Sequence, residues 1–149
     1  MDLSKIIPPE NVFIDISAPT KWRALQVLSS KAGELMQLDQ KVVLHALEVR
    51  ERLGSTGIGN GIAIPHSAVA GLDGPRGLIM RFGQPIDFEA IDDVPVDLAF
   101  LLLYGESARG EYLNVLAAVA RRLKADGIPD RMRWARTADE LYALFMAPA

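Results

Sequence analysis

Residues 96–104 have the sequence Val-Asp-Leu-Ala-Phe-Leu-Leu-Leu-Tyr, which is almost continuously apolar. This composition is typical of a central strand whose sheet is covered on both faces. We therefore expect an α/β fold in which helices flank both sides of a central sheet, with residues 96–104 in the middle of that sheet.

Three shorter apolar runs predict further strands, at residues 12–14, 62–64 and 78–82. Polar residues at 84–87 and 92–95 are expected to form the connection that leads into the central strand. Strands and helices are mixed along the chain without a linker or an internal repeat. We therefore expect a single domain that spans residues 1–149.

Apolar residues at three- and four-residue spacing predict helices between the strands. The first follows Pro19, the second runs from Asp39, a good N-cap residue, to about Leu53, and a third begins near Ala108. A capping box over residues 137–140, in which Glu140 bonds back to the amide of Thr137, predicts the start of the last helix. The third helix is expected to bury Leu113, Leu116, Ala117, Ala120 and Leu123.

The chain has 149 residues, half of them hydrophobic, and a net charge of −3. A nucleic-acid-binding protein usually carries a basic stripe, so this charge argues against that class. Basic residues do gather toward the C-terminus at helical spacing, and we expect them to form solvated helix faces. They are Arg121, Arg122, Lys124, Arg131, Arg133 and Arg136.

The sequence contains no cysteine, which excludes disulfides, thiolate catalysis and zinc–thiolate sites. The first residues lack the basic segment and apolar run of a signal peptide. No apolar stretch approaches the roughly 20 residues needed to cross a bilayer. We expect a cytoplasmic protein without membrane insertion.

His66 is the strongest candidate for a reactive group. It follows a short apolar strand and Pro65, just beyond a glycine-rich segment. Neutral imidazole is a competent nucleophile near pH 7, and covalent catalysis through histidine divides a group transfer into two easier steps. A structural or surface histidine is the alternative, and these residues alone leave both interpretations open.

The glycine-rich segment, residues 54–61, is expected to be a loop. It is not a Walker A motif, because Asn60 and Gly61 occupy the positions of its Lys and Ser or Thr. It is not a dinucleotide fingerprint either, because Ile62 replaces the last glycine and a strand follows. We therefore expect no cofactor. The loop can offer amides and the hydroxyls of Ser55 and Thr56 to one phosphoryl group, or it is simply a tight connection.

The remaining polar candidates are weaker. Arg50 could stabilise phosphoryl oxygens, although an ordinary solvated helix charge is the alternative. His45 is expected to be structural or exposed, and no metal-ligand spacing is present. Turn formation and solubility explain Asp92, Asp93 and Asp97, since no spacing supports a paired-carboxylate site.

Residues 50–66, Arg-Glu-Arg-Leu-Gly-Ser-Thr-Gly-Ile-Gly-Asn-Gly-Ile-Ala-Ile-Pro-His, closely resemble the active-site signature of enzyme IIA domains of the fructose/mannitol class. The resemblance is nearest to the nitrogen-regulatory branch of the bacterial phosphotransferase system. It continues through residues 85–98, 119–123 and 139–142, and so spans essentially the whole chain.

This resemblance implies a three-layer α/β/α sandwich with a mixed central sheet. It also implies that a histidine phosphocarrier protein, charged ultimately from phosphoenolpyruvate, phosphorylates His66 at Nε2. By the same analogy Arg50 stabilises the phosphate, and Ser55 is a further phosphate-binding candidate by position. In the nitrogen branch the phosphorylation state regulates targets such as potassium transport systems and sensor kinases.

One departure from the family concerns a second histidine that related proteins often place on the long helix, facing the reactive one. Tyr112 stands at the equivalent position here, with Asn114 two residues beyond. Neither can carry an imidazolium charge, although Tyr112 can donate a hydrogen bond. We expect phosphoryl acceptance to persist and onward transfer to be affected, which favours a regulatory role.

The sequence therefore predicts a regulatory phosphoryl-transfer protein. A sugar-specific enzyme IIA, which relays phosphate to an enzyme IIB for uptake, is the main alternative. A module that has lost transfer and signals only by docking is another, and the presence of His66 and Arg50 argues against it. No serine or cysteine constellation supports a hydrolase.

Overall fold

The computed structural model describes residues 2–147, and within them the side chains of all residues except Ala108 and Arg109. The strands are β1 (Val12–Ile16), β2 (Gly57–Gly59), β3 (Ile62–Ala63), β4 (His66–Ala68), β5 (Arg76–Ile86) and β6 (Val96–Tyr104). They form one sheet with the order β1-β5-β6-β3-β2, and β4 also pairs with β6. The sheet is mixed, because β1 is parallel to β5, and β3 and β4 are parallel to β6, whereas β5 and β6 are antiparallel.

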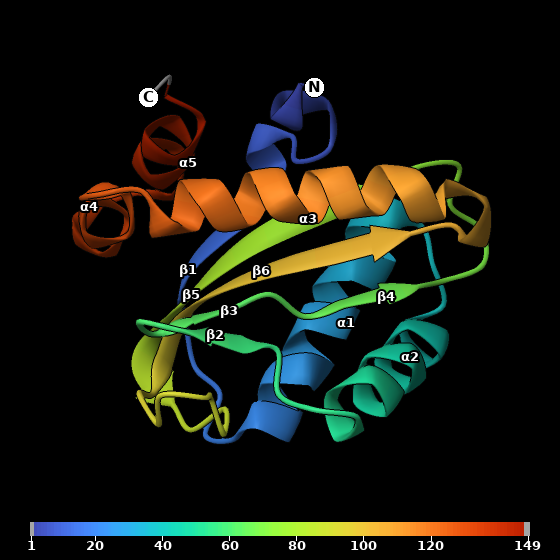
Figure 1. Ribbon diagram of the computed structural model, residues 1–149, viewed down its shortest axis with the longest axis horizontal. Helices are drawn as coiled ribbons and strands as arrows, with labels where there is room; N and C mark the ends of the chain where they lie inside the picture. Colours follow the sequence, from blue (N-terminus) through green and yellow to red (C-terminus); the bar gives the residue numbers. More distant parts are fainter. Residues whose placement is uncertain (1, 148–149) are drawn as a thin grey trace.

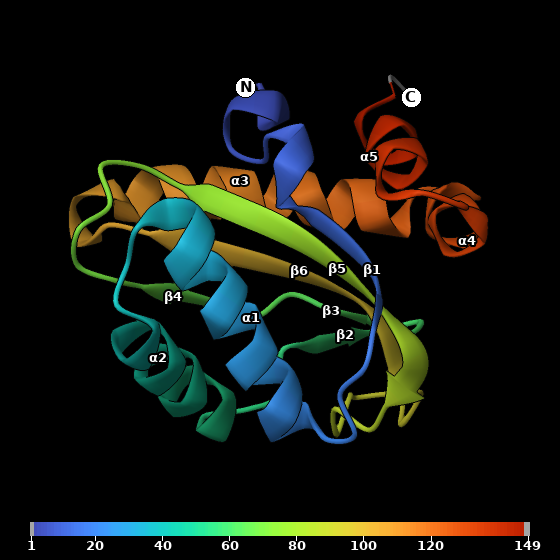
Figure 2. The same cartoon turned by 180° about the vertical axis from the view of Figure 1, so that it is seen from behind.

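Helices cover both faces of this sheet. On one face lie α1 (Lys21–Met36) and α2 (Gln40–Arg52), and on the other lie α3 (Arg109–Lys124), α4 (Ile128–Trp134) and α5 (Ala138–Met146). Figure 1 shows α3 crossing in front of the sheet, and Figure 2, from behind, shows α1 and α2 on the opposite side. Short 3₁₀ turns lie at Leu3–Lys5, Pro9–Asn11 and Glu106–Ala108. The predicted three-layer α/β/α fold is confirmed.

The central strand β6 occupies the predicted residues and divides its side chains between two cores. Leu98, Phe100 and Leu102 pack with α3 and α5, whereas Leu101 and Leu103 pack with α1 and α2. All five are at most 1% exposed. Successive side chains of a strand point to opposite faces, so a strand buried on both faces is apolar over its buried length, and Asp97, the polar residue of β6, is half-buried near its start.

Two predicted boundaries around the strands are wrong. The polar segment at 84–86 belongs to β5, which extends to Ile86 beyond a register shift and pairs there with Val96. Part of the predicted loop 54–61 is also a strand, because β2 pairs with β3 as an antiparallel hairpin. Asn60 and Gly61 form its turn with φ of +57° and +79°, a conformation that glycine adopts without strain.

The buried face of α3 was predicted only in part. Val115, Val119 and Leu123 are buried, four residues apart, whereas Leu113 is 56% exposed and Ala117 is exposed. The sequence pattern did not show which of two neighbouring stripes faces the sheet. The helix α4 was not predicted, since its seven residues are too few to show a helical period.

The capping of α5 was predicted correctly at Thr137, whose side chain accepts a hydrogen bond from the Glu140 amide. The Glu140 carboxylate, however, accepts from the amide of Arg136, one residue before the expected one.

Two of the basic residues expected on solvated faces are engaged in the fold. Arg122 donates to the carbonyl oxygen of Phe145, and Arg133 forms an ion pair with Asp97. Both are half-buried, whereas Arg121, Lys124, Arg131 and Arg136 are exposed. Within residues 2–147, no helix is both long and apolar enough to cross a membrane.

Candidate active site at His66

His66 is the first residue of β4, and backbone hydrogen bonds hold both this strand and the two residues that lead into it. His66 pairs with Leu102 of β6, and the Leu102 amide donates to the carbonyl of Pro65 at 3.0 Å. Two residues earlier, the amide of Ile64 donates to the carbonyl of Thr56 at 2.9 Å. The imidazole is half-buried, so a rigid backbone presents a partly accessible ring.

The protonation pattern of the ring follows from one contact. The Nδ1 atom of His66 lies 2.8 Å from the carbonyl oxygen of Ile64. A carbonyl can only accept a hydrogen bond, so Nδ1 carries the proton and donates it. In the neutral ring the lone pair is then on Nε2, which makes Nε2 the nucleophilic atom.

The surroundings favour that neutral form. Burial lowers the pKa of His66 below its ordinary value of 6.5, and the positive charge of Arg50 lowers it further. The hydrogen bond to Ile64 and the negative charge of Glu51 act in the opposite direction. The net pKa is lowered, so the ring is unprotonated and nucleophilic at neutral pH.

Arg50 lies in the last turn of α2, close enough to His66 to affect its pKa. Its Nη1 atom donates to the carbonyl of Gly54 at 2.9 Å. Among the side chains and backbone groups that the structure describes, this is its one hydrogen bond, and a guanidinium has five N–H donors. Arg50 is therefore anchored beside His66 and keeps donors for an anion.

The two hydroxyls of the glycine-rich segment are bonded to the protein. Ser55 donates to the carbonyl of Phe88 at 2.6 Å and accepts from the Gly57 amide at 3.0 Å. Thr56 donates from Oγ1 to Glu51 at 2.5 Å. Both side chains fix the segment in place. A phosphate-binding role for Ser55 stays a prediction, and it requires the Phe88 contact to open.

Sequence reasoning missed a buried ion pair beside the site, between Lys21 and Glu51. Lys21 Nζ lies 3.5 Å from Glu51 Oε2 and 3.2 Å from Glu89 Oε1. The side chains of Lys21 and Glu51 are 6% and 1% exposed, whereas that of Glu89 is 71% exposed. One signal was available, because Glu51 follows Val43 and Leu47 at four-residue spacing and so lies on the buried face of α2.

An aromatic pair borders the ring of His66. Tyr112 stacks on Tyr104 with ring centroids 3.8 Å apart, and its ring lies 6.4 Å from that of His66. Tyr112 thus occupies the place beside the reactive ring that the family resemblance assigns to a second histidine. Asn114 is exposed. His45 is also exposed, as expected for a histidine outside the site.

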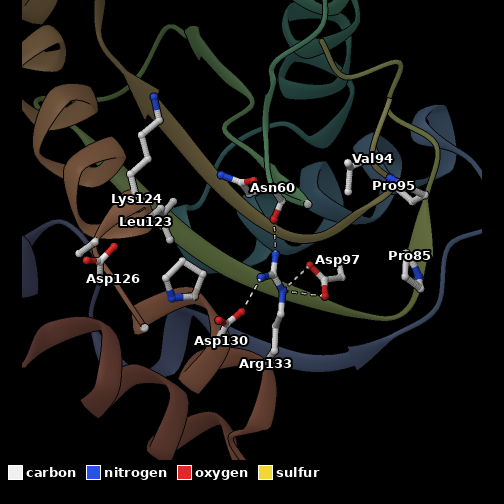
Figure 3. A pocket seen from close by; sticks show the side chains of 14 residues that line it. Asn60, Pro85, Val94, Pro95, Asp97, Leu123, Lys124, Asp126, Asp130 and Arg133 are labelled. Carbon is white, nitrogen blue, oxygen red and sulfur yellow. Dashed lines mark hydrogen bonds and ion pairs between the residues drawn. The ribbon is translucent and has the colours of Figure 1, made fainter. Parts of the chain in front are cut away.

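A separate cleft lies around Arg133 (Figure 3). It encloses about 490 Å³ between the β2–β3 turn and the α3–α4 connection. Asp97, one of its lining residues, lies about 17 Å along β6 from Leu102, the partner of His66. Among the described side chains, no three acidic or histidine groups gather as metal ligands would.

Comparison with known proteins agrees with this geometry. Residues 5–147 match the family described as "Phosphoenolpyruvate-dependent sugar phosphotransferase system, EIIA 2". The chain belongs to this family. The resemblance noted from residues 50–66 is thereby confirmed.

Similar proteins include nitrogen regulatory proteins of several bacteria. That of Bradyrhizobium diazoefficiens is 38% identical over 99% of this chain and 97% of its own length. That of Pseudomonas aeruginosa is 39% identical over 95% of this chain and 93% of its own. The crystal structure of nitrogen regulatory protein IIA-Ntr from Neisseria meningitidis, 33% identical, superimposes with a TM-score of 0.90 over 96% of this chain and 98% of that one. The chain is therefore a phosphotransferase-system protein of the nitrogen-regulatory kind.

Proposed function

We propose that this protein accepts a phosphoryl group on Nε2 of His66 from a histidine phosphocarrier protein and regulates partner proteins through its phosphorylation state. The observation that carries the proposal is the hydrogen bond from Nδ1 of His66 to the Ile64 carbonyl, which leaves the lone pair on Nε2. The family match and the nitrogen regulatory relatives support it.

In the proposed step, the Nε2 lone pair of His66 attacks the phosphorus atom of the donor's phosphohistidine. The new P–N bond forms as the donor P–N bond breaks, and the donor imidazole recovers its electron pair. The His66 ring gains positive character while Nδ1 keeps its proton, and the Ile64 carbonyl stabilises that charge. The Arg50 guanidinium stabilises the charge on the equatorial phosphoryl oxygens.

The aromatic surroundings favour regulation over onward transfer. Tyr112 stands beside His66 and carries no positive charge with which to stabilise a phosphoryl group in transit. The similarity to nitrogen regulatory proteins at 38–39% identity supports the same preference over a sugar-specific enzyme IIA. Potassium transport systems and sensor kinases are the proposed classes of regulated partner.

The same proposal places the protein in the cytoplasm, where phosphoenolpyruvate is made, and treats residues 1–149 as one functional domain. Neither cofactor nor metal takes part in the proposed transfer, because the attacking atom and the stabilising cation both come from the chain.

A reconstituted relay tests the proposal. Phosphoenolpyruvate, enzyme I, the phosphocarrier and this protein are combined, and intact mass is recorded beside a His66→Ala variant. We expect the gain of one phosphoryl group that is acid-labile, alkali-stable and absent from the variant. An unchanged mass with an active upstream pair would contradict phosphoryl acceptance and favour a module that acts only by docking.

A further inference from the structure

The buried carboxylate of Glu51 is connected to the reactive ring through a short series of hydrogen bonds. Its Oε2 atom accepts from the Thr56 amide at 2.9 Å, and its Oε1 atom accepts from the Thr56 hydroxyl at 2.5 Å. The carbonyl of Thr56 in turn accepts from the Ile64 amide, and the carbonyl of Ile64 accepts from Nδ1 of His66. Every link lies between 2.5 and 2.9 Å.

This series passes through Ile64, which donates from its amide to Thr56 and accepts at its carbonyl from His66. Ile64 follows directly after β3 and precedes Pro65, which has no amide hydrogen of its own. The orientation of the Ile64 carbonyl therefore depends on the Ile64 amide, which is bonded to Thr56, and on the Pro65 carbonyl, which is bonded to Leu102. The amide and the hydroxyl of Thr56 are both held by Glu51.

Glu51 is itself held in place by charge. Lys21 provides the buried cation, and both side chains are nearly inaccessible to solvent. A buried ion pair generally contributes less to stability than well-packed apolar residues of the same size. Among the described residues, the Glu51 carboxylate pairs with Lys21 and accepts its two hydrogen bonds from Thr56. This distribution of contacts is that of a group that sets the geometry of a loop.

We propose that Glu51 is a positioning residue for phosphoryl transfer, which acts through Thr56 and Ile64 to keep the proton of His66 on Nδ1 and the lone pair on Nε2. Because the tautomer of a histidine is set by the hydrogen bond of its other nitrogen, loosening the Ile64 carbonyl shifts the proton between the two ring nitrogens. The effect on the transfer rate rests on the proposed function, whereas the effect on the His66 tautomer does not.

The first measurement uses the unphosphorylated protein. Long-range ¹H–¹⁵N spectra of the His66 ring report the tautomer directly, for the wild type and for Glu51→Gln. We expect almost pure Nδ1–H in the wild type and a mixture in Glu51→Gln. Glu89→Gln is the matched control, because it removes the negative charge of the exposed partner of the same lysine and leaves the contacts of Thr56 intact. It should retain the wild-type tautomer.

The second measurement is the rate of phosphorylation in the reconstituted relay. Small misplacements of reacting groups cost up to about a hundredfold, so we expect Glu51→Gln to lower the rate about tenfold or more and Glu89→Gln to leave it unchanged. Thr56→Val should lower the rate several-fold, because it loses the hydroxyl but keeps the amide, and Thr56→Ser should restore it. If Glu51→Gln fails to fold, the comparison of Thr56→Val with Thr56→Ser tests the positioning role instead.

The outcomes separate the two proposals. Wild-type rate and tautomer in folded Glu51→Gln would overturn the positioning role, as would equal behaviour of Thr56→Val and Thr56→Ser. A wild-type protein that accepts no phosphoryl group would overturn the proposed function, while the ring spectra would still test whether Glu51 controls the tautomer.

Discussion

The two arginines near opposite ends of β6 differ in how completely the fold uses their donors. Arg133 donates from Nε to Asp97, from Nη1 to Asp130 and from Nη2 to the carbonyl of Asn60 (Figure 3). Arg50 donates from one nitrogen to one carbonyl. A cleft of about 490 Å³ surrounds Arg133, yet the imidazole of His66 lies beside Arg50.

This difference shows that the volume of a cleft does not indicate whether reactive groups and free hydrogen-bond donors lie in it. At the Arg133 end, the guanidinium joins the β2–β3 turn to α4 and to the start of β6, and its charge is matched by two aspartates. At the Arg50 end, a guanidinium with one hydrogen bond stands beside a half-buried neutral imidazole whose lone pair is on Nε2. The first arrangement stabilises the fold, and the second can bind and receive an anion.

The largest expected effect is that of Arg50→Ala on phosphorylation. Removing a preorganised donor to developing negative charge costs about a hundredfold or more in rate. We expect a loss of that size in the relay, with a smaller loss for Arg50→Lys, which retains charge but not the fork of donors. Arg52→Ala is the matched control, because this exposed neighbour contacts the ring of Trp22. Equal rates for the two alanine variants would contradict the role of Arg50.

The next effect concerns stability at the other end of the strand. Arg133→Met leaves Asp97 without its cation, and both side chains are about a quarter exposed, at 24% and 23%. We expect the free energy of unfolding to fall by about 2 kcal/mol, measured by urea denaturation. The phosphorylation rate at 25 °C should not change. A large loss of rate in a folded Arg133→Met protein would show that the cleft takes part in transfer.

The smallest effect is a dependence of stability on pH that belongs to His66. Because its folded pKa is lowered, the unfolded chain binds a proton that the native protein resists as pH falls below 6.5. The free energy of unfolding is therefore independent of this group well above pH 6.5. It decreases as pH falls through 6.5 toward the folded pKa. A His66→Gln variant should show a shallower decrease over that range, measured by unfolding at several pH values. A steeper decrease would mean that the folded pKa is raised.

The predictions from sequence succeeded where a local pattern was sufficient. The continuous apolar run identified β6 at its observed boundaries, and Asp39 and Thr137 cap the helices that they were expected to begin. They failed where a choice depended on a distant partner. Leu113 and Val115 are equally apolar, and only the packing of α3 on the sheet buries Val115 and exposes Leu113.

By itself, the sequence determined the α/β class through its apolar periodicity. Its resemblance to the family, carried mainly by residues 50–66, implied the three-layer fold and His66 and Arg50 as the candidate reactive pair. The tertiary structure decided which nitrogen of His66 bears the proton, that Lys21 and Glu51 form a buried pair, and that Arg133 is committed to Asp97. Each of these depends on groups that are far apart in the chain or on the orientation of a single carbonyl. A pattern of residue types along the chain shows neither the pairing of distant groups nor the orientation of a carbonyl, since these arise only when the elements pack together.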